Sequence, residues 1–237
     1  MSSEREERGP RASNAPRMAR LPTKTLPAFT PGTWIADPFF RGHELALTAL
    51  ADLPHWPTAE ELDARLGPIV ARALGAPLCF RAQMKSEPMR YEATIVVRRE
   101  VPTRDGSPHD LLNALVWATF PRSKFALHER FHEAEAARAV PGRTRFQDRL
   151  TLLDEGAALR GDEGGPAWLF GHAILEHRIA HHAGARAELF VLPSTELTHD
   201  TASVDRAFAA ALRGFPDPAP PRPAGVSLLE LFPEASP

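Results

Sequence analysis

The sequence predicts an α+β fold: a single compact domain in which a small mixed or antiparallel sheet packs with several helices. Segments with helix caps alternate irregularly with short runs of β-branched and aromatic residues, an order typical of α+β domains. The chain has 237 residues, of which 43% are apolar. It is therefore long enough to bury one substantial core.

The two ends of the chain differ in composition from the middle. Residues 1–28 carry charges and prolines but few apolar side chains, which predicts a disordered tail. We expect one globular domain over residues 29–215. Residues 216–237 begin with the proline-rich stretch PDPAPPRPAG and continue with the apolar stretch VSLLELFP, which we expect either to dock on the domain or to bind a partner.

Helix signals are strongest in two segments. The first, PTAEELDARLGPIVARALG, has Thr58 as its cap and Gly75 at its end, and Pro68 is expected to bend it or split it in two. The second, SPHDLLNALVWATF, has Ser107 as its cap and Pro108 at the first helical position. The nearly continuous apolar body of the second segment predicts a buried helix.

Three further helices are expected in the second half of the chain. They are SKFALHERFHEAEAARA, PAWLFGHAILEHRIAHHAG and DTASVDRAFAAALRG, the last of which has Asp200 or Thr201 as its cap. Their apolar residues recur at helical spacing.

Strands are predicted where β-branched and aromatic residues gather. LCFRAQ (78–83) and YEATIVVRR (91–99) read as two strands that form a hairpin. RLTLLDEGAALRGDEGG is predicted to form a strand, a turn at Asp154 to Gly156 and a short return strand, and AELFVLP a further strand.

Charge and cysteine content limit the function classes. The net charge of −2 gives no overall positive field, so we expect no nucleic-acid or membrane binding. The single cysteine, Cys79, lies in the apolar run PLCF and is expected to be a buried, inert thiol, which suits a cytoplasmic protein. No secretion signal and no apolar run long enough to span a membrane is evident.

The segment HERFH matches the H-E-x-x-H pattern of zinc peptidases. His128 and His132 are four residues apart, the spacing at which two rings on one helical face reach one metal ion. The continuation that would supply a third ligand is absent, because His132 is followed by EAEAARAV. The surrounding charges favour an exposed helix over a zinc site.

The stretch from 102 to 124 carries the most polarity that the fold alone does not explain. Asp110, Asn113 and Trp117 fall on one side of the predicted helix, and His109 lies beside Asn113. Cations flank both ends of the helix and are expected either to bind a phosphate or carboxylate or to form ion pairs. These cations are Arg104, Arg122 and Lys124, and the acids considered as their partners are Asp148, Asp154 and Glu155.

Four short segments of the sequence together resemble a bacterial family of domains of unknown function, numbered 3025. The segments are PTR (102–104), HDLLNALVWATFPRSK (109–124), RFQDRLTLLDEGA (145–157) and GHAILE (171–176). The resemblance covers roughly residues 78–195 and implies no established activity. It implies a shared set of polar positions: Arg104, His109, Asp110, Asn113, Arg122, Lys124, Asp148, Asp154, Glu155, His172 and Glu176. His128 is outside this set, since the family often carries Asn there.

Three functions are compatible with these residues. The first is a metal-assisted or acid/base hydrolase of a small anionic substrate such as a phosphoester, with a divalent metal (Mg²⁺, Mn²⁺ or Zn²⁺) as the candidate cofactor. The second is a non-catalytic module whose polar residues form a buried network. The third is a zinc peptidase acting through HERFH. For the first, the expected catalytic residues are His109, Asp110, Asp154, Glu155 and His172; the substrate-binding residues are Arg104, Asn113, Arg122 and Lys124; and Asp148 and Glu176 are supporting.

Overall fold

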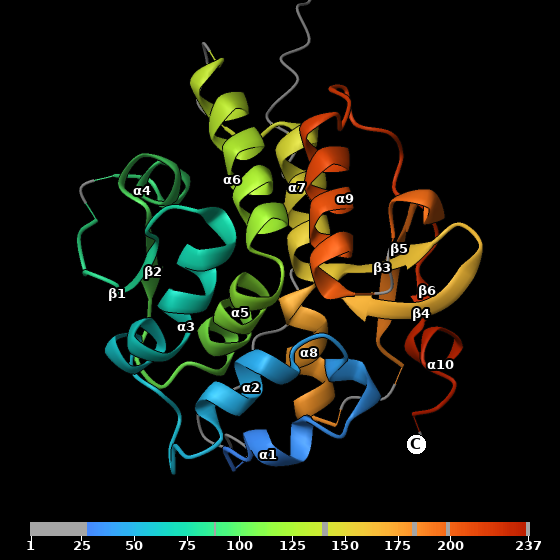
Figure 1. The fold of residues 1–237 in the computed structure, drawn as a ribbon. Coiled ribbons are helices and arrows are strands. Elements are labelled where there is room, and N and C mark those ends of the chain that lie inside the picture. Colours follow the sequence, from blue (N-terminus) through green and yellow to red (C-terminus); the bar gives the residue numbers. More distant parts are fainter. Residues whose placement is uncertain (1–27, 88, 139–141, 182–183, 198–199, 236–237) are drawn as a thin grey trace, which may run out of the picture.

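A computed structural model describes residues 28–235 except 88, 139–141, 182–183 and 198–199. The fold is α+β, as the sequence predicts (Figure 1). Except for Ala28, the expected N-terminal tail lies outside the described residues. In the part of the chain that is described, no helix combines the length and apolar character needed to cross a membrane.

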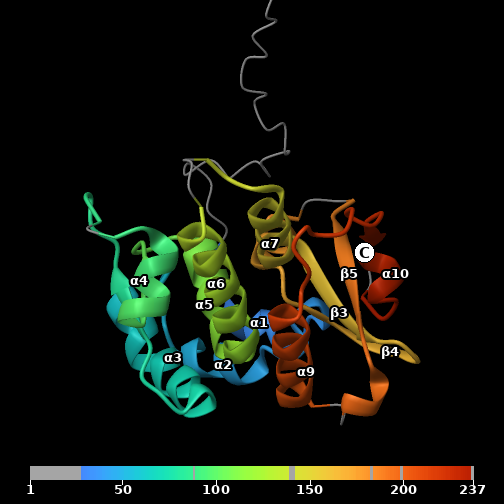
Figure 2. The same ribbon diagram turned by 90° about the horizontal axis from the view of Figure 1, so that it is seen from above.

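Two sheets lie on either side of a central group of helices. The larger sheet has the strand order β4 (Gly164–Leu169), β3 (Ala157–Gly161), β5 (Arg186–Leu192) and β6 (Val226–Ser227). Strand β3 runs parallel to β5 and antiparallel to β4. The smaller sheet pairs β1 (Cys79–Ala82) with β2 (Glu100–Thr103) in parallel. In Figures 1 and 2, helices α5, α6, α7 and α9 lie between the sheets.

The best-capped helices follow the sequence prediction. Helix α3 (Ala59–Leu74) begins at a capping box formed by Thr58 and Glu61 and ends at Gly75 in the left-handed conformation. Pro68 lies inside this helix and does not split it. Helices α5 (Pro108–Thr119) and α9 (Thr201–Arg213) are capped by Ser107 and Asp200, respectively, whose side chains accept a backbone N–H three residues on.

Helix α6 (Pro121–Ala136) is capped by a distant residue. Its first residue is a proline and Phe120 provides no side-chain cap, so the N–H groups of its first turn need other acceptors. The Asp205 carboxylate of α9 accepts the N–H groups of Arg122 (3.1 Å) and Ser123 (2.8 Å). The Ser123 hydroxyl donates in turn to the Asp205 carbonyl (2.8 Å). This contact fixes α6 against α9.

The segment predicted as a strand at residues 91–99 is instead helix α4 (Tyr91–Arg98), so the predicted hairpin is wrong. Burial follows a helical face, with Thr94 and Ile95 buried and Val97 61% exposed. Arg99 ends the helix at a positive φ of 60°. Tertiary contacts outweigh the strand preference of these β-branched residues, because such preferences are weak. Strand β1 pairs with Glu100–Thr103 instead.

The stretch predicted as a strand and turn at residues 149–156 is the second half of helix α7 (Arg145–Gly156). A capping box of Thr144 and Gln147 starts this helix, and its side chains at helical spacing are buried. Arg149 reaches across to the Glu188 carboxylate of β5 with both terminal nitrogens. The expected return strand is β3, which pairs in parallel with β5.

Helix α8 (His172–Ile179) begins later than predicted, because PAWL belongs to β4. Gly171 separates the strand from the helix at a close crossing of the backbone. A Cβ at this position would lie 2.6 Å from the Glu155 carbonyl oxygen and from the Gly156 nitrogen. Any side chain at this position would clash with the backbone at the end of α7, so glycine is required.

The remaining segments cover the two ends of the core. Helices α1 (Pro31–Trp34) and α2 (Glu44–Leu50), with the 3-10 turn Pro38–Phe40 between them, pack at the N-terminal end. At the other end, a 3-10 turn (Ser194–Glu196) follows β5. The C-terminal stretch docks on the domain through β6 and α10 (Leu228–Leu231), burying Leu228, Leu231 and Phe232.

Candidate functional site

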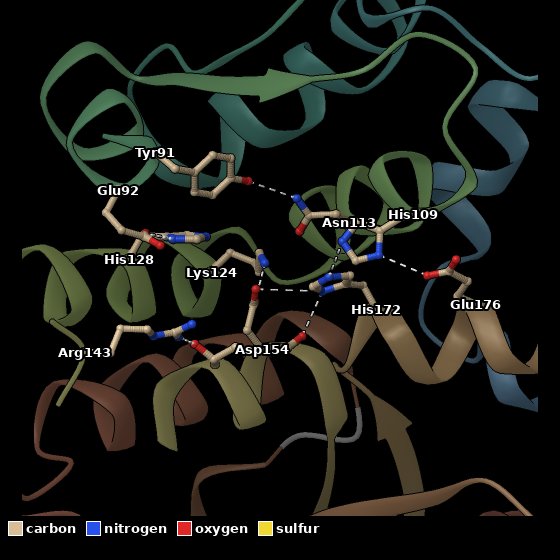
Figure 3. A network of polar contacts seen from close by, with 11 residues as sticks. Tyr91, Glu92, His109, Asn113, Lys124, His128, Arg143, Asp154, His172 and Glu176 are labelled. Carbon is tan, nitrogen blue, oxygen red and sulfur yellow. Dashed lines mark hydrogen bonds and ion pairs between the residues drawn. The ribbon is translucent and has the colours of Figure 1, made fainter. Parts of the chain in front are cut away.

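Polar side chains from α4 to α8 meet in one cluster inside the protein (Figure 3). Helix α5 contributes His109, Asn113 and Trp117, which are spaced four residues apart and share one face. Helix α6 contributes Lys124 and His128 with the same spacing. Residues that are distant in the sequence are thus brought together by helix packing.

A buried ion pair forms the centre of the cluster. The Lys124 ammonium is fully buried and donates to the Asp154 carboxylate at the end of α7. The ammonium also lies 5.7 Å from the Trp117 ring centroid. Burial alone would raise the pKa of the Asp154 carboxyl, but the charges of Lys124, His172 and His128 hold it well below its usual range. Asp154 is therefore ionised at neutral pH.

Two histidines and a glutamate form a chain next to this ion pair. His172 Nδ1 lies 2.9 Å from the Asp154 carbonyl oxygen. His172 Nε2 lies 3.3 Å from His109 Nε2, and His109 Nδ1 lies 3.0 Å from a carboxylate oxygen of Glu176. Burial, joined by the charge of Lys124, lowers the pKa of His172 to about 3. His172 is therefore neutral, whereas the His109 side chain is 25% exposed and reaches the surface.

Arg104 and Asp110 form a second charged group beside this chain. The Asp110 carboxylate accepts Arg104 Nε (2.8 Å), Nη2 (2.7 Å) and the backbone N–H (2.7 Å). These hydrogen bonds raise the pKa of Arg104, and the charges of Asp110 and Glu176 add to the effect. The Arg104 side chain is 40% exposed. Its Nη1 edge makes no hydrogen bond in the described part of the protein and can receive an anionic oxygen.

His128 is buried and paired, so the prediction of an exposed helix at HERFH is wrong for this residue. Its Nδ1 contacts the Glu92 carboxylate of α4, and its ring stacks on Trp117 with centroids 5.4 Å apart. Its Nε2 is buried without a hydrogen-bond partner among the described residues. The same holds for Trp117 Nε1 and Asn113 Oδ1.

Tyr91 contacts two of these residues, Asn113 and His128, from the side of α4. Asn113 Nδ2 donates to its hydroxyl oxygen (3.3 Å), and its ring lies edge-on to His128 with centroids 5.8 Å apart. The residue is 37% exposed overall, but Figure 3 shows its hydroxyl pointing into the cluster. Burial of this hydroxyl, with the charges of Glu92 and Asp154, raises the pKa of Tyr91.

The structure places the other predicted site residues in different contacts. Arg122 pairs with Asp205, whose own pKa is raised because the carboxyl is buried. Asp148 lies near the start of α7 in a partly exposed ion pair with Arg143 at 3.4 Å. Glu155 follows Asp154 near the end of α7 and is partly buried. Arg122 and Asp148 thus belong to ion pairs of their own.

Within the described ranges, no three His, Cys, Asp or Glu side chains are grouped so that they could hold a metal ion. The pairing of His128 with Glu92 also does not favour a zinc-peptidase site, which would need His128, His132 and a third ligand to converge.

Residues 78–162 match the model of a family described as "Protein of unknown function (DUF3025)". The match confirms the resemblance seen in the sequence. No curated protein and no solved structure matches the chain significantly.

The DUF3025 stretch supplies α4 to α7 and therefore most of the cluster. His172 and Glu176 lie on α8, beyond its last matched residue. Sequence reasoning missed Tyr91 and Glu92, because the segment that carries them was predicted to be a strand. The short spacing of Tyr91 and Glu92 from Thr94 and Ile95, one helical turn on, is the only signal in the sequence that could have placed them on a helix.

Proposed function

We propose that the chain is an acid/base hydrolase that acts on a small anionic substrate such as a phosphoester. The observation that carries the proposal is the hydrogen-bonded chain of Glu176, His109 and His172. Three hydrogen bonds link these groups to each other and to the Asp154 carbonyl. Each requires one hydrogen atom, but two neutral imidazoles supply only two.

The third proton is held by His109 and Glu176. The Asp154 carbonyl can only accept, so the single hydrogen of the neutral His172 is on Nδ1, and its Nε2 is an acceptor. His109 must then donate from Nε2. Its Nδ1 contact with Glu176 uses one further proton, which is shared between the ring and the carboxylate. A partly exposed histidine with an exchangeable proton is suited to act as a general acid.

The charges around His109 favour an anionic substrate. The Nη1 edge of Arg104 can bind an oxygen of the substrate. A substrate oxygen that replaces His172 as the acceptor would take the His109 proton as its bond to the phosphorus or carbon breaks. The proposal involves no metal ion in this step.

A non-catalytic module is the second candidate, and one observation favours it. The three cations expected to bind substrate are each paired with a carboxylate: Arg104 with Asp110, Arg122 with Asp205 and Lys124 with Asp154. A set of paired charges of this kind can fix the fold without taking part in catalysis.

Activity and stability measured on one pair of variants separate the two candidates. Wild-type protein and the variant His109→Gln are assayed with p-nitrophenyl phosphate, bis(p-nitrophenyl) phosphate and the uncharged p-nitrophenyl acetate. The control is His55→Gln, which removes an exposed histidine that also contacts a carboxylate, that of Glu61 (3.1 Å).

The hydrolase proposal expects His109→Gln to lose about 100-fold in kcat/KM on a phosphoester, while the control keeps its activity. Thermal unfolding should show both variants folded. Equal rates for His109→Gln and wild type, or a wild-type protein inactive on all three esters, would favour the non-catalytic module.

A further inference from the structure

A second carboxylate–imidazole pair lies in the same cluster as His109 and Glu176. The Glu92 carboxylate can only accept when ionised, so its contact with His128 places a hydrogen on His128 Nδ1. In the neutral ring, Nε2 then carries a lone pair. This is the arrangement in which a carboxylate orients an imidazole that acts as a general base.

The free nitrogen of His128 faces the inside of the protein. The side chain is 3% exposed, and its Nε2 has no hydrogen-bond partner among the described residues. A buried polar atom that stays unpaired is costly, and such atoms in native structures mark a functional group or the place of another molecule. The Nδ1 side is held by Glu92, so the free side is available for chemistry.

Two further unpartnered atoms lie next to His128. Trp117 stacks on its ring in a nearly parallel orientation, 4° between planes, and leaves Nε1 without a partner in the described part of the chain. Asn113 lies one turn earlier on α5 and leaves Oδ1 unpaired in the same sense. Together they leave one N–H donor and one acceptor unpaired in the same cluster as the acceptor His128 Nε2.

The two histidine pairs border the same central ion pair. Both His128 and His172 favour the ionised form of Asp154, and His172 contacts His109. Asn113 lies one helical turn from His109 on α5. Figure 3 shows His128 and His109 on opposite sides of Lys124.

We propose that His128 is the general base of the hydrolase and that Glu92 is its positioning residue. This inference rests on the proposed function. His128 Nε2 takes a proton from water while the water oxygen forms a bond to the phosphorus. The bond from phosphorus to the leaving oxygen breaks, and that oxygen takes the proton of His109. One water molecule is consumed, one alcohol is released, and the proton on His128 returns to His109 through solvent.

The variant His128→Asn tests the base, with His55→Asn, which removes an exposed histidine paired with the Glu61 carboxylate, as the control. On the phosphoester that the wild-type protein hydrolyses, His128→Asn should lose at least about 100-fold in kcat, and His55→Asn should be unchanged. Glu92→Gln, which keeps the imidazole, should lose about 10-fold in kcat. This variant tests the proposal if His128→Asn does not fold.

Nitrogen-15 NMR of the histidine rings gives a readout that needs no substrate. The signals of His128, assigned by their loss in His128→Asn, should show a proton on Nδ1 and none on Nε2. In Glu92→Gln this preference should be lost together with activity. A purely structural role of His128 would not link the position of the ring proton to the activity. A proton on Nε2 in the wild-type protein would overturn the inference.

The outcomes also separate the two proposals. Loss of activity in both His109→Gln and His128→Asn supports both. Loss in His109→Gln alone overturns the base and leaves the hydrolase standing. A wild-type protein that hydrolyses none of the esters overturns both.

Discussion

Helix α6 takes part in two buried polar regions that differ in how completely they are paired. At its start, the Asp205 carboxylate accepts two backbone N–H groups and Ser123 bonds back to α9. In its middle, Lys124 is paired, but the neighbouring His128, Trp117 and Asn113 keep unpartnered atoms within the described residues. Complete pairing is what a structural contact requires, whereas incomplete pairing costs stability and is retained where it serves a function.

The largest effect is expected from breaking the buried ion pair of Lys124 and Asp154. Lys124→Met leaves the Asp154 carboxylate buried without its cation and should lower the free energy of unfolding by about 3–5 kcal/mol. Chemical denaturation at neutral pH measures the loss.

The double variant Lys124→Met with Asp154→Leu provides the control. It removes both charges and should recover most of the lost stability, because a buried ion pair adds little over an apolar replacement. A double variant as unstable as the single one would mean that Asp154 has a structural role beyond this pair.

A smaller loss is expected from the completely paired region. Asp205→Ala removes the cap of α6 and leaves two N–H groups without an acceptor, which should cost about 2 kcal/mol. Asp148→Ala is the matched control, since Asp148 is also a helical aspartate paired with an arginine but is partly exposed and should cost less than about 0.5 kcal/mol. Equal losses in the two variants would contradict the role given to Asp205.

The smallest expected effect concerns the pH dependence of stability. Burial lowers the pKa of His43 from its usual 6.5 to about 4, where its ring contacts Thr119 and the Leu169 carbonyl. Below pH 6.5 the unfolded chain binds this proton and the folded protein does not, so stability is lost as the pH falls toward about 4. His43 should contribute about 1.4 kcal/mol per pH unit to this slope.

Denaturation of wild type and His43→Gln at several pH values between 4 and 6.5 measures that contribution. The variant should keep only the part of the slope that other groups supply, among them His172, whose pKa is lowered in the same direction. An unchanged slope would show that His43 accepts a proton in the folded protein.

The sequence predicted helices well where local chemistry determines them. Thr58, Ser107 and Asp200 all cap the helices expected from them, because a cap and the N–H it accepts are only three residues apart. Tyr91–Arg98 and Arg145–Gly156 were predicted wrongly, because their β-branched and leucine-rich residues suit either structure. Packing against α6 and contact with Glu188 decide these segments, and both contacts are distant in the sequence.

The candidate site was predictable only in part, for the same reason. His109 and Asn113 could be singled out because polar residues on an apolar helix need partners. The partner of His128 could not, since Glu92 lies 36 residues away on a segment with the wrong predicted structure. Lys124 and Arg122 were placed in the site as cations that flank the end of that helix, but the Arg122 side chain reaches α9 instead.

The outer strand of the larger sheet has a consequence for how the chain is made. Strand β6 lies near the end of the sequence and pairs with β5, which was synthesised more than thirty residues earlier. During translation, the edge of β5 at Arg186 and Ala187 therefore exposes its peptide groups until β6 emerges. A nascent or shortened chain would offer that edge to other strands, and such edges are common starting points of aggregation.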